Sequence, residues 1–174
     1  MDGASVRLET ERLLLRPWED RDRAPLAAIL GDPQVRRFYP RVLTREQSDA
    51  AMDRAIAATT AGSLSFFAAE HKATGRLVGW LGIAPIPDDL RVAMRGNPEI
   101  EIGWLLAQEF WGQGLAPEAA AAWLHHGFTV LNLPEIVAFT FRGNQPSRRV
   151  MEKLGMSRDP AGDFDHPLIA AGHP

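Results

Sequence analysis

Apolar residues recur at helical spacing in four parts of the chain. The clearest case is residues 116–131, where Ala119, Trp123 and Leu131 belong to one stripe whose members are three or four positions apart. The same pattern predicts helices over 19–30, 44–61 and 146–154. Thr44 and Gln47 are placed to form a capping box at the start of the second of these helices.

Short runs rich in apolar and β-branched residues predict five strands. The runs cover residues 12–16, 63–70, 76–83, 99–106 and 135–141. Thr74-Gly75 predicts a hairpin turn between the second and third strands, and residues 85–98, with three prolines, predict a loop. Hairpin-like strands followed by a β-α-β unit predict an α/β (α+β) fold, a mixed sheet with helices on its faces.

Length and composition set the broad class. A chain of 174 residues with 45% hydrophobic and 24% charged residues fits one soluble domain, 1–174, with a loose leader at 1–7 and an irregular tail at 157–174. A net charge of -3 makes a nucleic-acid partner unexpected. With no Cys there is no disulfide, thiolate metal site or cysteine nucleophile. The N-terminus has no long apolar run, so we expect a cytoplasmic protein without a membrane segment.

A glycine-containing turn precedes the strongest predicted helix. Its sequence, Trp111-Gly112-Gln113-Gly114-Leu115-Ala116, joins the strand at 99–106 to that helix. The first N–H groups of a helix have no intrahelical partner, and the helix dipole adds positive charge, so this arrangement suits a phosphate group. A plain loop with glycines for a tight turn is the alternative. The turn is neither a P-loop nor a dinucleotide fingerprint.

This turn resembles the cofactor turn of the GCN5-related N-acetyltransferases, the GNAT family, whose pattern is Gln/Arg-x-x-Gly-x-Gly/Ala. Gly114 and Ala116 match its last two positions, and Trp111 replaces the Gln or Arg, as in the branch resembling ribosomal-protein N-terminal acetyltransferases. Residues 10–16 (Thr-Glu-Arg-Leu-Leu-Leu-Arg), 101–105 and 143–156 also resemble that branch. The resemblance runs from Thr10 to Met156 in the family's order.

The resemblance implies an acyl-CoA N-acyltransferase fold, splayed between the fourth and fifth strands, with the pantetheine arm of acetyl-CoA in the gap. A backbone N–H within residues 103–105 would bind the thioester carbonyl, although Gly103 could instead mark a β-bulge. The implied cofactor-binding residues are Ile102, Gly103, Trp104, Leu105, Gly112, Gln113, Gly114, Leu115, Ala116, Asn144 and Ser147.

Two residues are the candidate catalytic groups. Glu101 matches the position where the family often has a carboxylate, and desolvation there would raise its pKa toward the range of a general base. Its alternative is a solvated strand carboxylate. Ser147 would protonate the leaving thiolate. Asn144 would contact the cofactor arm or merely cap the following helix.

The expected activity is acetyl transfer from acetyl-CoA to a primary amine, on a protein N-terminus or a small molecule, by direct attack and without a metal. A non-catalytic acyl-CoA-binding or regulatory module of the same fold is the alternative. The tail at 157–174 has almost no strand pattern, so no further strand is predicted to pair with the apolar strand at 135–141. We therefore expect the edge of that strand, with its unpaired N–H and C=O groups, to be covered in another way. We expect this cover to come from the tail itself, from a second subunit in a homodimer, or from residues absent from the given sequence.

Overall fold

The computed structural model describes residues 6–167 of the chain. Its sheet contains five antiparallel strands in the order β1-β2-β3-β4-β5. Their bounds are Leu8–Glu9 (β1), Leu13–Arg16 (β2), Ser65–His71 (β3), Arg76–Pro85 (β4) and Ile100–Leu106 (β5). The four longer strands confirm the first four predicted ones, with ends that shift by at most two residues. The two-residue β1 was not predicted, because a pair of residues carries no period.

Five α-helices accompany the sheet. They are Arg23–Leu30 (α1), Arg45–Thr60 (α2), Asp88–Arg91 (α3), Leu115–Thr129 (α4) and Gln145–Lys153 (α5). The helix predicted from residue 19 is divided, since a 3-10 turn at Asp20–Asp22 precedes α1. The single-turn α3 lies in the segment predicted as loop, which is a correction. The capping box of α2 is confirmed, because Thr44 and Gln47 each bind the other's backbone N–H.

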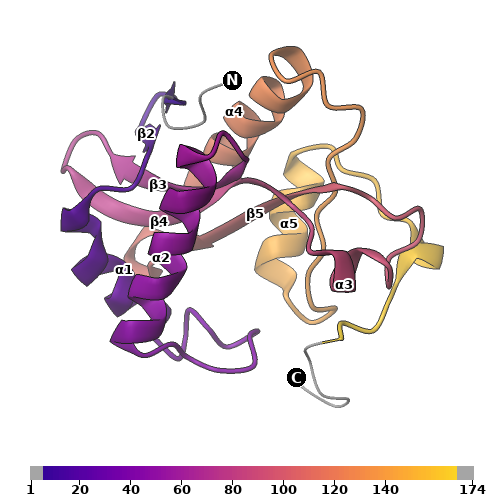
Figure 1. Ribbon diagram of the computed structural model, residues 1–174, viewed down its shortest axis with the longest axis horizontal. Coiled ribbons are helices and arrows are strands. Elements are labelled where there is room, and N and C mark those ends of the chain that lie inside the picture. The colour runs from indigo at the N-terminus through magenta and orange to yellow at the C-terminus, as the bar shows by residue number, and fades with distance from the viewer. Residues whose placement is uncertain (1–5, 168–174) are drawn as a thin grey trace.

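Helices pack on both faces of the sheet (Figure 1). Side chains of α1 and α2, such as Leu26 and Met52, share one core with Leu105 of β5. Trp123 of α4 shares the other core with Ile102 and Leu106 of β5. Successive strand residues point to opposite faces, so β5 contributes side chains to both layers.

Residues 135–141 do not form the predicted strand. Val137 makes one parallel bridge to β5, in which it accepts from the N–H of Ile102 at 2.8 Å and donates to the carbonyl of Ile100 at 3.0 Å. No further ladder bond joins these two segments within residues 6–167. The rings beyond the bridge pack elsewhere, Phe139 against Phe164 and Phe141 against Phe38. The sheet is therefore mixed only at this bridge, and the expected splay begins after it.

The predicted tail is partly described. Residues 157–167 contain a 3-10 turn, Pro160–Gly162, and bring Phe164 and His166 against Phe139. The remainder of the tail, and residues 1–5 of the predicted leader, lie outside the described residues. In the part that is described, no helix has the length and apolar character needed to cross a bilayer.

Candidate active site beside β5

The turn between β5 and α4 presents backbone N–H groups that the protein does not use. Gly112 and Gly114 have φ angles of 73° and 77°, which glycine adopts without strain. The N–H groups of Gly112, Gln113 and Gly114 donate to no acceptor among residues 6–167. Leu115 and Ala116 open α4, where N–H groups have no intrahelical partner. A Cβ on Gly112 would meet nothing within 4 Å, so the turn is open and fits an anion.

Arg12 and Glu118 hold this turn to the start of β2. Glu118, in the first turn of α4, accepts from the Nε of Arg12 at 2.7 Å, from its backbone N–H at 2.8 Å, and from the hydroxyl of Thr10. The Nη1 of Arg12 donates to the carbonyl of Gln113 at 2.8 Å. Burial opposes ionisation of Glu118, but the hydrogen bonds from Thr10 and Arg12 lower its pKa. Thr10 and Arg12 belong to the segment that resembles the family, but the resemblance does not indicate their contact with Glu118.

The outer edge of β5 presents further backbone N–H groups. Ala107 donates to Val78 of β4, whereas Ile102 donates outward to Val137. Because donors alternate along a strand, the N–H of Trp104 also points outward, beyond the last bond to residues 135–141. Among residues 103–105, from which the resemblance takes the donor to the thioester carbonyl, only Trp104 has an N–H on the outer side of the strand.

Gly103 lies in regular register opposite Gly82, so it is not a β-bulge. A Cβ on Gly103 would lie 2.8 Å from the ring of Phe66, which stacks on Trp80. Glycine is thus needed here because an aromatic ring crosses the strand.

Glu101 lies on the same face of β5 as Gly103 and Leu105, the face toward α1 and α2. Its carboxyl is partly buried, and desolvation raises its pKa from 4.5 to about 7. This result confirms the expected shift and excludes a fully solvated strand carboxylate. A group with this pKa can accept a proton near neutral pH.

Asn144 and Ser147 begin α5 on the other side of the gap. The side chain of Asn144 accepts from the N–H of Ser147 at 3.2 Å and donates to Thr140 at 2.9 Å. Asn144 therefore caps α5, and its contact with the cofactor arm stays a prediction. The indole of Trp104 donates to the Ser147 hydroxyl at 3.3 Å. Because this oxygen already accepts a hydrogen bond, its own O–H remains free to donate.

The loop between α1 and α2, residues 31–44, reaches over the same region. Arg37 lies 4.8 Å from the ring centroid of Trp111, and Phe38 stacks on Phe141 at 6.1 Å. Desolvation of its hydroxyl, and then the negative charge of Glu101, raise the pKa of Tyr39, although 39% of the residue is exposed. The sequence pattern of this loop indicates none of these contacts, because each of them joins residues more than 60 positions apart.

A separate cavity of about 540 Å³ lies beneath α1 and contains none of the predicted site residues. Its charged lining is largely paired within the protein, as in Arg76 with Glu109. No group of three or more His, Asp or Glu placed to hold a metal ion occurs in residues 6–167.

Comparison with known families matches residues 12–157 to the model of the Acetyltransferase (GNAT) domain. The uncharacterized protein YkkB of Bacillus subtilis is 35% identical over 155 residues, which cover 88% of this chain and 87% of YkkB.

Two solved structures are also similar. An acetyltransferase from Agrobacterium tumefaciens superposes with a TM-score of 0.78 at 28% identity, over 93% of this chain and 90% of that one. RimJ of Mycobacterium smegmatis, in complex with CoA-disulfide, has a TM-score of 0.68 at 25% identity, over 86% of this chain and 75% of that one.

Proposed function

The chain belongs to the GNAT acetyltransferase family, and on this premise we propose that it moves an acetyl group from acetyl-CoA to a primary amine by direct attack. Members of this family use acetyl-CoA, which supplies the acetyl group as an activated thioester. The open turn at residues 112–116 fits its pyrophosphate, because it offers N–H groups that have no acceptor within residues 6–167 at a helix N-terminus.

Residues on the two faces and the outer edge of β5 carry out the proton transfers and bind the thioester carbonyl. Glu101 accepts the proton that the amine loses as its nitrogen bonds to the acetyl carbon, either directly or through water. The outward N–H of Trp104 binds the carbonyl oxygen while negative charge develops on it. Ser147 donates a proton to the sulfur as the carbon–sulfur bond breaks. Ile102, Gly103 and Leu105 form the strand wall of this gap.

The observation that carries the proposal is the carboxyl of Glu101. Its pKa is about 7, it lies at the single bridge to Val137, and the free N–H of Trp104 follows on the same strand. A protein that only binds acyl-CoA has no use for a desolvated carboxyl at that position, and leaving it there costs stability.

A non-catalytic acyl-CoA-binding module is the rival, since it would use the same turn. Calorimetry with acetyl-CoA and measurement of thiol release across a panel of amines and peptides distinguish the two. The proposal expects binding together with amine-dependent thiol release, which Glu101→Gln lowers without weakening binding. Tight binding with no release for any acceptor would favour the module.

The acceptor is proposed as a small-molecule amine or a protein N-terminus, and the location as the cytoplasm, in keeping with a chain without Cys. The contact of Phe164 with Phe139 supports a cover for residues 135–141 by the chain's own tail. A homodimer remains the other proposal for that edge, which light scattering over a concentration series would detect.

A further inference from the structure

The α1–α2 loop brings arginines to the acceptor side of the gap. Val35 anchors it in the core below α1, and the N–H of Tyr39 donates to the carbonyl of Arg36 at 2.8 Å. The contacts of Arg37 with Trp111 and of Phe38 with Phe141 fix the loop between the cofactor turn and the segment that leads to α5. Arg36 therefore lies in a loop that packing contacts hold in place.

Most other arginines within residues 6–167 form an ion pair with a carboxylate, whereas the arginines near this loop do not. Arg36, Arg37 and Arg41 of the loop, and Arg54 of α2, form no ion pair with any of residues 6–167. Arginines that do form ion pairs are Arg12, Arg16, Arg21, Arg23, Arg45, Arg76, Arg91, Arg95, Arg142 and Arg158. In a chain with more acidic than basic residues, this leaves a local excess of positive charge.

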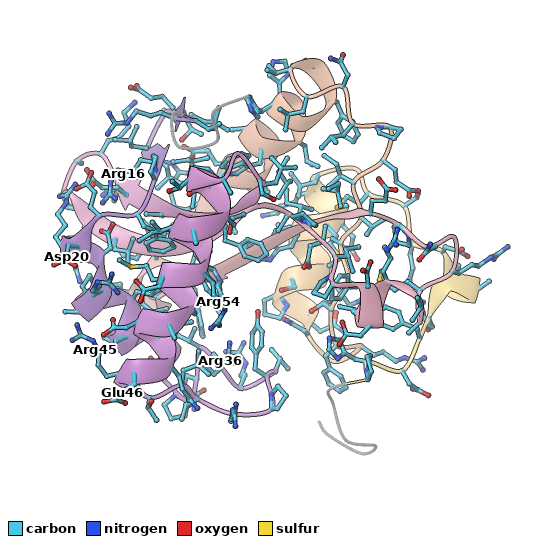
Figure 2. The ribbon with its side chains drawn as sticks, viewed as in Figure 1. Arg16, Asp20, Arg36, Arg45, Glu46 and Arg54 are labelled. Atoms are coloured by element: carbon cyan, nitrogen blue, oxygen red, sulfur yellow. The ribbon has the colours of Figure 1, made fainter. Side chains whose placement is uncertain are left out.

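Arg36 is the best placed of the four to bind a ligand. It is half-buried, its guanidinium lies 4.0 Å from the ring centroid of Tyr39, and its Nε donates to the carbonyl of Arg41. Its two terminal amino groups have no acceptor within residues 6–167, and burial lowers its pKa. A half-buried cation without a partner is costly, so an anion that fills this position is favoured. Arg36 and Arg54 lie on the α5 side of α2 in Figure 2, whereas Arg45 lies on the opposite side.

We propose that the acceptor amine carries a carboxylate, which binds Arg36 beside Tyr39 while the amine nitrogen faces Glu101. This inference rests on the proposed acetyl transfer and names its substrate class. Arg36 would serve as a specificity residue, since a guanidinium matches the two oxygens of a carboxylate. Polyamines would be disfavoured, because their second cation would meet the unpaired arginines.

The test is acceptor selectivity of the wild-type protein. Amines are compared in pairs that differ only in the carboxylate, such as 4-aminobutyrate with its amide, together with spermidine. Dipeptides Ser-Glu-amide and Ser-Gln-amide show whether an acidic peptide can replace a small acceptor. Rates are expressed per neutral amine, because amidation also changes the pKa of the amine. We expect kcat/KM to be at least about tenfold higher for the carboxylate in a pair.

Arg36→Gln should reduce this preference to about one, and Arg36→Lys should keep part of it. Arg45→Gln is the matched control, because Arg45 pairs with Asp49 and lies across α2 from the site. Acetyl-CoA affinity and thermal unfolding show that each variant is folded. Equal use of acid and amide by the wild type, or an unchanged preference in Arg36→Gln, would overturn the carboxylate acceptor but leave acetyl transfer intact. No turnover of any amine would overturn both.

Discussion

At the scale of single residues, Glu101 has two consequences that can be measured together. Because the pKa of Glu101 is about 7, kcat/KM expressed per neutral amine should rise with pH and level off above that value, as the carboxylate forms. Glu101→Gln should lower kcat by about a hundredfold and remove this inflection. Acetyl-CoA affinity, measured by calorimetry, should stay unchanged. If Glu101→Gln kept the wild-type pH–rate profile, another group would have to accept the proton from the amine.

Stability gives an independent readout of the same residue. A carboxyl whose folded pKa is raised destabilises the fold when ionised, so the cost appears as pH rises from 4.5 to about 7 and is complete above that. Glu101→Gln should therefore stabilise the protein by about 1–3 kcal/mol at pH 8 and by almost nothing at pH 4. Equal unfolding free energies at pH 8 would contradict the burial of this charge.

Trp104 and Ser147 should behave as one unit. Trp104→Phe keeps the backbone donor but removes the indole N–H that holds the Ser147 hydroxyl. Ser147→Ala should lower kcat by about a hundredfold, Trp104→Phe by less, and the double variant by no more than Ser147→Ala. Additive losses in this cycle would show that the indole acts independently of Ser147.

At the scale of elements, the cofactor turn can be tested against a matched glycine. Gly112 and Gly75 both have positive φ, 73° and 65°, and open space where a Cβ would be. Gly112→Glu and Gly75→Glu should thus cost similar stability. Only Gly112→Glu should weaken acetyl-CoA binding, by at least about tenfold, because it places a negative charge at the pyrophosphate position. Equal acetyl-CoA affinities of the two variants would show that this turn does not bind the pyrophosphate.

The Arg12–Glu118 contact should act on binding rather than on chemistry. Glu118→Gln weakens three hydrogen bonds that hold β2 to the turn, so we expect a severalfold weaker acetyl-CoA affinity and a loss of about 1–3 kcal/mol in stability. Because its folded pKa is lowered, that loss should vanish as acid protonates Glu118 in the wild type. Glu109→Gln, at an exposed pair with Arg76, should change neither quantity.

Elements with a local period could be predicted from sequence, and those that depend on distant partners could not. The strands of the hairpins and the helices α2, α4 and α5 follow spacings within one segment. Residues 135–141 have the composition of a strand, but Phe139 and Phe141 pack against Phe164 and Phe38 instead of continuing a ladder. Of the proposed site, the sequence indicates Glu101 and Gly114, where a family motif matches, but neither Arg36 nor the indole contact of Trp104, which depend on distant segments.

At the scale of the whole molecule, β5 would separate the two proton transfers of the proposed reaction. Glu101 faces the layer of α1 and α2, together with the loop of residues 31–44. The indole of Trp104 meets Ser147 in the layer of α4 and α5. In the proposed reaction, the amine would lose its proton on one face of the sheet and the thiolate would receive a proton on the other, and the two faces meet at the gap beside residues 135–141.

Direct transfer is the central claim, and a single-turnover experiment tests it best. Enzyme in excess is mixed with isotopically labelled acetyl-CoA, with and without an amine, then quenched and analysed by mass spectrometry. The account predicts that one labelled acetyl group appears on the amine for each thiol released, while the mass of the protein stays constant throughout. Label on the protein, or acetyl-CoA that remains intact with every amine, would contradict it.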